Sequence, residues 1–168
     1  DIVPCLRCMH CYHIATEHWN IQCSVNPRFR RENRVPRKLE KTVKPKTVVV
    51  VGGGPAGMKA VLTAEEQGHR VILLERAAQL GGQLNWADYD DYKKELKAYR
   101  EYLIRQIVKS SVEVRLETEA TPEMIASLAP DDLILGLGAE FITPRIPGAE
   151  YARQAVTLYP ELDSAQGR

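Results

Sequence analysis

The chain has 168 residues, of which 44% are hydrophobic and 27% charged, and its formal net charge is +1. This is the composition of an ordinary soluble globular protein, with room for one domain or for one domain and an appendage. It excludes a membrane-spanning helix, because no apolar run approaches the length needed to cross a bilayer. The first residues show neither an initiator Met nor a signal-peptide pattern, so we expect a fragment of a longer chain.

The net charge hides an asymmetry between the two ends of the chain. Residues 1–46 contain ten Lys and Arg against four Asp and Glu, whereas residues 47–168 contain 13 against 18. A short arginine-rich stretch can contact nucleic acid. Here no aromatic platform is interleaved with the arginines and no nucleic-acid fold follows. We therefore interpret the stretch as a solvated linker, or as a surface that meets an acidic domain, and expect no nucleic-acid partner.

All four cysteines lie near the start of the chain, at Cys5, Cys8, Cys11 and Cys23. Such clustering argues against a distributed disulfide framework and for a metal site in a reducing compartment, which predicts a cytoplasmic protein. Three cysteines at two-residue gaps are the usual opening of a [4Fe–4S] site, and four is the number of ligands that this cluster needs. We therefore predict an irregular, cysteine-rich cluster-binding segment over residues 1–27.

Zinc is the alternative metal, because four-cysteine zinc sites also use pairs separated by two residues. Zinc ribbons normally have two separated pairs, whereas here three ligands stand together and one apart. Unligated thiols are the third interpretation. Residues 28–46 follow as a basic Pro- and Arg-rich stretch with little apolar periodicity, which predicts an extended linker.

The stretch from Thr47 to Glu75 predicts a strand, a tight turn, a helix and a second strand that ends in an acid. Val48–Val51 is typical of a short strand buried on both faces, and the pattern Gly52-x-Gly54-x-x-Gly57 follows at once. A bare pattern of this kind is weak evidence for a ligand. The strand before it, the helix after it and the acid at the right distance supply the context that confirms dinucleotide binding.

Each part of this stretch suits a bound dinucleotide. Gly52 permits a sharp turn out of the strand, Gly54 lets the backbone approach a pyrophosphate, and Gly57 lets the helix pack close to the sheet. The N-terminus of the helix, where Pro55 forfeits no hydrogen bond, presents free N–H groups to the phosphates. Glu75 can accept hydrogen bonds from ribose hydroxyls and would repel a 2′-phosphate, which disfavours NADP.

The second half of the chain predicts further elements of the same domain. A helix is predicted over residues 89–109, a strand over 112–116 and a buried strand over 132–135. Between the two strands, Thr121 followed by Pro122 is typical of a helix start. The apolar face of the first helix consists of Tyr92, Leu96, Tyr99, Leu103 and Ile107.

The order of elements predicts an α/β fold. Residues 47–148 should form a Rossmann-like dinucleotide-binding domain, with a parallel sheet flanked by helices. Residues 149–168 show no strong pattern and are predicted to be a tail.

Several short motifs stand in a fixed order along the chain. They are the cysteines, Asn26-Pro27, GGGPAG at 52–57, GGQ at 81–83, Gly-Ala-Glu at 138–140 and IPG at 146–148. In this order they resemble the multidomain NADH:flavin oxidoreductases related to old yellow enzyme. That family includes 2,4-dienoyl-CoA reductase, 2-enoate reductase and trimethylamine dehydrogenase, and the resemblance covers nearly the whole chain.

The resemblance implies a parent protein with several cofactors. An N-terminal (β/α)8 barrel would hold FMN and the small-molecule substrate, with a [4Fe–4S] cluster at its edge. An FAD- or ADP-binding domain would follow, with an NAD(H)-binding domain inserted into it. This chain would start at the cluster loop and stop near the entry to the inserted domain. The barrel and the NAD(H) domain would then be partners outside it, and the parent would be a homo-oligomer.

The resemblance also implies residue roles. Cys5, Cys8, Cys11 and Cys23 match the cluster ligands. The positions matched to the dinucleotide are Gly52, Gly54, Pro55, Ala56, Gly57, Glu75, Arg76, Gly82, Gln83, Ala120 and Gly138. The chain departs from the family at Leu137, where a residue with a hydroxyl usually stands, and this leaves open whether FAD or only ADP is held.

The combined prediction is an electron-transfer segment of a flavin- and [4Fe–4S]-dependent NADH oxidoreductase that is not catalytic by itself. The parent would pass electrons from NADH through FAD and the cluster to FMN, and reduce an activated C=C bond, or run in the reverse direction. One alternative is a module resembling the small subunit of glutamate synthase, which usually has more cysteines. The other is a non-catalytic zinc- and nucleotide-binding module.

Overall fold

The centre of the molecule is a four-stranded sheet in which every pairing is parallel and the order is β3-β2-β1-β4. The computed structural model describes residues 2–17, 21–89 and 91–159, so the last part of the predicted tail lies outside it. A parallel sheet in the order 3-2-1-4 is that of a Rossmann-like fold, and the predicted fold class is confirmed. The strands are β1 (Thr47–Val51), β2 (Arg70–Leu74), β3 (Glu113–Arg115) and β4 (Asp132–Leu135).

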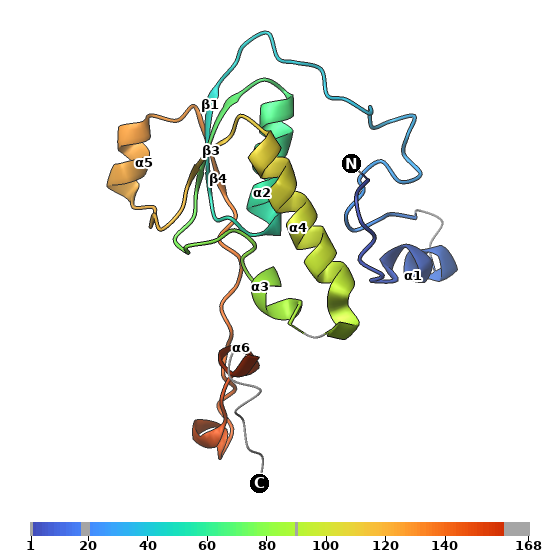
Figure 1. Ribbon diagram of the computed structural model, residues 1–168, viewed down its shortest axis with the longest axis vertical. Helices are drawn as coiled ribbons and strands as arrows, with labels where there is room; N and C mark the ends of the chain where they lie inside the picture. Colours follow the sequence, from blue (N-terminus) through green and yellow to red (C-terminus); the bar gives the residue numbers. More distant parts are fainter. Residues whose placement is uncertain (1, 18–20, 90, 160–168) are drawn as a thin grey trace.

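Helices cover both faces of the sheet (Figure 1). Two long helices lie on one face, α2 (Pro55–Glu66) and α4 (Lys94–Lys109), and the shorter α5 (Pro122–Leu128) lies on the other. The remaining helical turns are α1 (His10–Glu17), α3 (Leu84–Ala87), η1 (Asp91–Lys93), η2 (Ala149–Tyr151) and α6 (Ala155–Leu158).

The core consists of two apolar clusters, one on each face of the sheet. On the first face, Val48, Val50 and Leu73 pack against the buried stripes of α2 and α4. On the second face, Val49 and Ile72 pack against α5. Successive strand residues point to opposite faces, so a strand covered on both sides needs a continuous apolar run. The valine run that follows Thr47 meets that requirement.

Two sequence-based expectations are wrong in detail. The strand at 132–135 was expected to be buried, yet Leu133 and Leu135 are 44% and 62% exposed. The reason is that β4 is an edge strand that pairs only with β1, while α5 packs over β1 and β2. The helix expected from residue 89 begins at Lys94, after the 3₁₀ turn η1, and Tyr92 is 93% exposed. A 3₁₀ turn has three residues per turn rather than 3.6, so Tyr92 falls out of phase with the buried face of α4.

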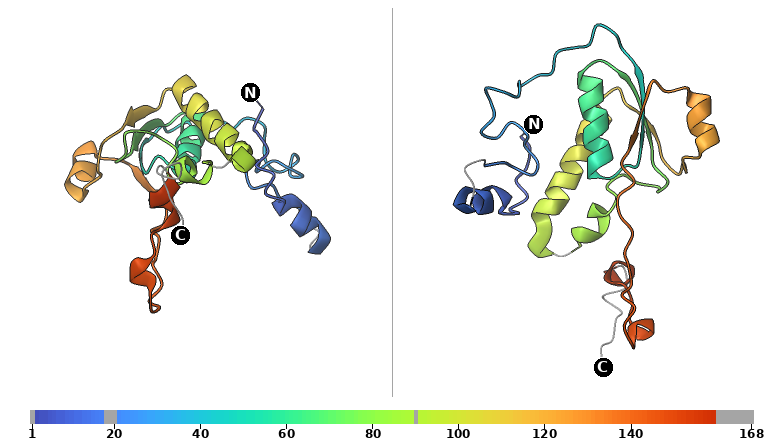
Figure 2. Two further views of the ribbon diagram at one scale, coloured as in Figure 1. Left: turned by 60° about the horizontal axis from the view of Figure 1, so that its bottom comes forward. Right: turned by 180° about the vertical axis from the view of Figure 1, so that it is seen from behind.

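The N-terminal residues lie on the α4 side of the sheet, opposite α5, in both views of Figure 2. An ion pair between Arg7 and Glu95, with Nη1 and Oε1 2.8 Å apart, joins them to the first turn of α4. The chain after β4 extends away from the sheet toward α6 (Figure 1). In the described part of the chain, no helix combines the length and the apolar character that spanning a membrane requires.

Helix α5 offers a test of the capping prediction. Thr121 precedes the helix and its hydroxyl accepts a hydrogen bond from the Met124 N–H at 3.2 Å, as expected for an N-cap. Replacing Thr121 by Ala should lower the free energy of unfolding by about 1 kcal/mol. Ser127→Ala is the control, because the Ser127 hydroxyl only donates back to the Met124 carbonyl of the same helix. Urea denaturation measures both variants, and equal stabilities would contradict the capping role.

Candidate functional site

The glycine loop between β1 and α2 lies at the carboxyl edge of the sheet, and two of its glycines are required by packing. A Cβ on Gly57 would overlap the carbonyl oxygen of Gly52, and a Cβ on Gly52 would overlap the carbonyl of Gly136. Gly52 also has a φ of +104°, a conformation that favours glycine. These two positions therefore set how closely α2 and the chain after β4 approach the end of β1.

Gly54 is different, because nothing inside the protein requires a glycine there. Its φ of −72° is ordinary, and a Cβ built on it would meet only the Gly82 Cα, at 4.0 Å. The space beside Gly54 is therefore open on the side that does not face the core. An open approach to the backbone at the middle glycine is what a bound pyrophosphate needs, so this part of the structure fits a dinucleotide.

The first turn of α2 borders the same space. Pro55 is at its first position, and the first helical hydrogen bond is donated by Met58 to the Gly54 carbonyl at 2.9 Å. The N–H groups of Ala56 and Gly57 come before that bond and have no partner within the helix. Together with the positive end of the helix dipole, they form a site suited to an anion.

Glu75 follows β2, and the residue is only 8% exposed. Its Oε2 accepts from the Gly53 N–H at 2.5 Å and its Oε1 from the Ala77 N–H at 2.7 Å. An ionised carboxylate has about four acceptor positions, so about two remain for hydroxyls of a ligand. The acid expected to meet a ribose therefore also ties the glycine loop to the chain after β2. Arg76, next to it, is exposed.

A second loop, residues 80–83, packs against the glycine loop. The Gly81 N–H donates to the Gly53 carbonyl at 2.9 Å, and a Cβ on Gly82 would come within 2.9 Å of the Gly54 Cα. Behind it, Asn85 Nδ2 donates to the Leu80 carbonyl at 3.3 Å. The structure thus brings Gly54 and Gly82 together, and their approach to one ligand stays a prediction.

The side chain of Gln83 does not lie free beside the glycine loop. Its Nε2 donates to the Ala139 carbonyl at 2.7 Å, so it joins the second loop to the chain after β4, next to Gly138. Gly138 has a φ of +75°, and a Cβ built on it would meet no atom within 4 Å. Ala120 is partly buried against the α5 face of the sheet. It belongs to the same edge, because the nearby Thr118 N–H donates to the Glu75 carbonyl at 2.9 Å.

The cysteine segment, by which we mean the described part of residues 1–27, contains the four predicted ligands as free thiols. The Arg7 N–H donates to Cys5 Sγ at 3.4 Å, and Cys8 Sγ lies 3.4 Å from Ser24 Oγ. The hydrogen bond with Ser24 lowers the pKa of Cys8 and so favours the thiolate that metals bind. Hydrogen bonds of both kinds suit the sulfurs of an iron–sulfur site, so the donor chemistry fits a [4Fe–4S] cluster.

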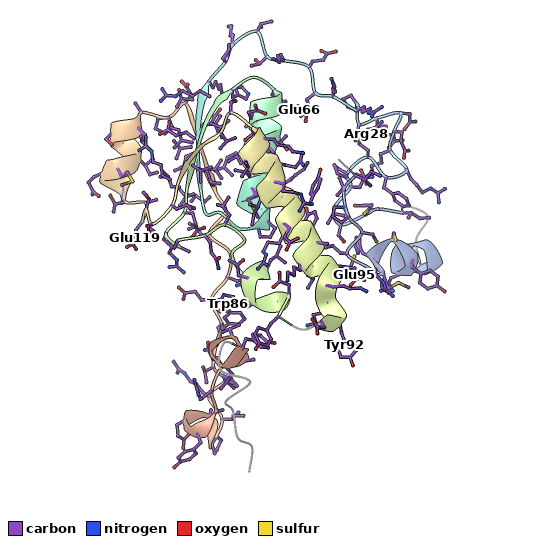
Figure 3. All side chains as sticks on the ribbon, viewed as in Figure 1. Arg28, Glu66, Trp86, Tyr92, Glu95 and Glu119 are labelled. Atoms are coloured by element: carbon purple, nitrogen blue, oxygen red, sulfur yellow. The ribbon has the colours of Figure 1, made fainter. Side chains whose placement is uncertain are left out.

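The four cysteines lie in one segment, but their side chains do not converge on a common metal position. Within the residues that the structure describes, no three Cys, His, Asp or Glu side chains converge as ligands of one metal ion. The set of metal ligands therefore stays a prediction. The segment is nevertheless held close to the domain, because the Arg7 guanidinium donates to Glu95, and this bond lowers the pKa of Glu95. Figure 3 shows Glu95 at the end of α4 that faces the segment.

Sequence reasoning missed three residues that shape the second loop. Arg100 on α4 donates from Nη1 to Asn85 Oδ1 at 2.8 Å, and its Nη2 lies 3.1 Å from Asp88 Oδ2. These contacts tie the second loop to α4. No short motif marks them, because the three residues become neighbours only when α4 packs. The amide of Gly53 was also missed, although this middle glycine of the GGG run was a visible signal.

One cavity of about 550 Å³ in the described structure is not part of this arrangement. It lies between α4 and β3, and is lined by Leu80, Ile104 and Val114 among others. None of the predicted site residues lines it. The open edge at Gly54, rather than this cavity, is the candidate site.

A glycine loop at the carboxyl edge of a parallel sheet, a helix N-terminus beside it and an acid on the next strand define a dinucleotide-binding domain of the Rossmann type. Residues 47–125 match the family described as FAD dependent oxidoreductase. The chain belongs to the FAD-dependent oxidoreductases, in the group of flavoproteins related to old yellow enzyme. The resemblance predicted from the motifs is confirmed.

The relatives are much longer than this chain. It is 46% identical over 134 residues to an NADH oxidase from Thermoanaerobacter brockii, covering 80% of this chain and 20% of that protein. It is 32% identical over 159 residues to a cinnamate reductase from Clostridium sporogenes, covering 94% and 24%. The solved structure of a 2-naphthoyl-CoA reductase with 2-naphthoyl-CoA superposes with a TM-score of 0.88 at 28% identity, covering 96% and 25%. The chain spans about a fifth to a quarter of these proteins.

A pair of alanine variants separates packing from ligand binding in the glycine loop. Gly57→Ala overlaps the Gly52 carbonyl and should lower the free energy of unfolding by about 1–3 kcal/mol. Gly54→Ala meets no close neighbour, so its free energy of unfolding should change by less than about 1 kcal/mol. Its affinity for ADP should still fall by at least about tenfold, because the new methyl group occupies the open space.

Chemical denaturation and calorimetric titration with ADP measure these two quantities. Wild-type ADP affinity in the Gly54→Ala protein would show that the open space does not hold a pyrophosphate. Wild-type stability of Gly57→Ala would contradict the close approach of α2 to β1.

Replacing Glu75 by Gln tests the double role of the acid. A Gln side chain has one acceptor oxygen, so its NH₂ group must face either the Gly53 or the Ala77 N–H. We expect a loss of about 1–3 kcal/mol in the free energy of unfolding, together with weaker ADP binding. Glu119→Gln is the control, since Glu119 is exposed in the loop after β3 (Figure 3). Equal behaviour of the two variants in the same assays would rule out the structural role of Glu75.

Proposed function

We propose that this chain is the dinucleotide-binding and electron-transfer part of a flavin- and [4Fe–4S]-dependent NADH oxidoreductase. The observation that carries the proposal is the open backbone at Gly54, next to the helix N-terminus and the acceptor positions of Glu75. Close packing explains why residues 52 and 57 are glycines, but it does not explain the glycine at position 54. A bound ligand that approaches the backbone at Gly54 would explain it. The cysteine segment, held against the same domain through Arg7, supplies the second half of the proposal.

The chain's own residues have distinct tasks in dinucleotide binding. The amides of Ala56 and Gly57 would hold the pyrophosphate, and Gly54 and Gly82 would leave room for it. Glu75 would accept hydrogen bonds from the ribose hydroxyls of the adenosine half, and its charge would exclude a 2′-phosphate. Bound FAD supplies hydride and single-electron chemistry. We include Pro55, Arg76, Gln83, Ala120 and Gly138 in the proposed site, from their places along the same edge.

Cys5, Cys8, Cys11 and Cys23 would ligate the cluster, which supplies one-electron transfer. Arg7 and Ser24 would act on two of these sulfurs through the hydrogen bonds already described. Such bonds help to set the potential of an iron–sulfur site. The residues of this chain would therefore bind and orient the dinucleotide and the cluster and tune the cluster's potential. The substrate would react in another domain of the parent protein.

The names of two relatives support a proposal for the substrate of the parent protein. One acts, by its name, as an NADH oxidase and another as a cinnamate reductase. We infer that the parent protein takes electrons from NADH and reduces an activated C=C bond in the cytoplasm. The FMN-binding barrel, the NAD(H)-binding domain and a homo-oligomeric assembly of the parent belong to the same proposal.

Metal and flavin analysis of the anaerobically purified protein tests the proposed function. We expect about four iron and four sulfide per chain, and stoichiometric binding of FAD or ADP. Cys23→Ser should lose iron and sulfide while it keeps ADP affinity, because the two sites use different residues. One zinc per chain without sulfide would replace the redox function by that of a zinc- and nucleotide-binding module. Failure to bind both FAD and ADP would contradict the proposed flavin-binding function.

A further inference from the structure

Arg100 is a charged residue of α4 that lies mostly buried beside the second loop. Its side chain is 17% exposed, and α4 packs next to α3, the short helix that follows this loop (Figure 1). The fully buried positions of the same helix are Tyr99, Leu103 and Ile107. A guanidinium is costly to bury unless it is paired and hydrogen-bonded. The partners of Arg100 therefore show what this charge does.

Asp88 balances the charge of Arg100. Its side chain is 6% exposed, and its Oδ2 lies 3.1 Å from Arg100 Nη2. The same oxygen makes no hydrogen bond of good geometry among the described residues, so the contact is an ion pair without a directed bond. Such a contact compensates two buried charges but gives little direction to either group. The directed bond of Arg100 is the one to Asn85.

The contact with Asn85 fixes which way its amide group points. A guanidinium can only donate, so Arg100 Nη1, at 2.8 Å, requires the Oδ1 atom of Asn85. The Nδ2 atom of Asn85 is then turned toward the Leu80 carbonyl, to which it donates at 3.3 Å. In the opposite orientation an amide oxygen would face that carbonyl, and the two acceptors would repel each other. Arg100 thus acts on the backbone of the second loop through Asn85.

The second loop is confined from both sides. A Cβ on Gly81 would overlap Asn85 Oδ1 and come within 2.9 Å of Arg100 Cδ. On the other side, the Gly81 N–H donates to the carbonyl of the glycine loop already described. The next two N–H groups, of Gly82 and Gln83, have no hydrogen-bond partner within the described part of the chain. These amides are therefore available to a ligand, beside the point where Gly82 meets Gly54.

We propose that Arg100 is a positioning residue for the pyrophosphate of the bound dinucleotide. Through Asn85 it holds the second loop against the glycine loop, so that the available amides of the second loop can donate to phosphate oxygens. This inference deepens the proposed function and rests on it, because it needs a dinucleotide at Gly54. It also makes a distinction within the ligand. The phosphates depend on Arg100, whereas the adenosine half depends on Glu75, which follows β2.

The test uses two ligands that differ only in their phosphates, ADP and adenosine, in NMR titrations. Arg100→Met keeps an aliphatic stem and removes the donors, so its ADP affinity should fall by at least about tenfold. Its adenosine affinity should equal that of the wild type. Asn85→Ala should show the same pattern, because it breaks the same link. Arg105→Met is the control and should change neither affinity, since Arg105 lies on the same helix, is 56% exposed and pairs with Glu101.

A second variant separates the positioning role from stability and charge. Arg100→Met alone leaves the Asp88 carboxylate buried and unpaired, which destabilises the fold. The double variant Arg100→Met/Asp88→Asn removes both charges, so its thermal stability should return toward that of the wild type. Its ADP affinity should stay low, because Asn85 still lacks its donor. Recovery of ADP affinity in the double variant would attribute the loss to the unpaired charge and would overturn the inference.

The remaining outcomes tell the two proposals apart. A wild-type protein that binds neither ADP nor FAD overturns the proposed function and this inference with it. A wild-type protein that binds ADP, beside an Arg100→Met variant of unchanged ADP affinity, overturns this inference alone. Equal losses of ADP and adenosine affinity would reveal general damage to the site, and would also overturn the positioning role.

Discussion

The shape of the candidate site depends on the Glu75 carboxylate, which accepts hydrogen bonds from two backbone amides. One amide belongs to the glycine loop and the other to the chain after β2, so a single buried charge fixes the distance between the two segments. Backbone donors satisfy a buried carboxylate without needing a cationic side chain. A ligand that reaches this edge would therefore meet a loop whose form is already set, and little conformational entropy would be lost on binding.

Local features of the sequence predicted much of the fold. The valine run, the glycine spacing and the Thr121-Pro122 pair each determine structure within a few residues, and their elements formed as expected. The exposure of β4 was not predictable in this way, because Leu133 lies in an apolar run and only the strand order makes it an edge residue. The late start of α4 depends on a 3₁₀ turn that periodicity over longer windows does not resolve.

In the candidate site, too, some residues could be predicted from the sequence and others could not. Gly52, Gly54 and Gly57 were visible because a tight turn, an open approach and close helix packing each need a glycine at a fixed spacing. The contacts of Arg100 with Asn85 and Asp88, and the place of Tyr99 beside the cysteine segment, involve residues that meet only through tertiary packing. No spacing rule connects such residues. Supporting groups of this kind are found from the structure, even where the groups that touch a ligand are evident in the sequence.

Helix α4 contacts both halves of the molecule within a short distance. Glu95 and Tyr99 face the cysteine segment, and Arg100, one residue further, supports the loop that packs on Gly54. At 1.5 Å per residue, these contacts lie within about 8 Å along one rigid helix. A shift of α4 caused by occupancy of one site would be felt at the other. Thermodynamic linkage would then make the effect mutual: whatever nucleotide binding does to the electron affinity of the metal centre, reduction of that centre does to nucleotide affinity.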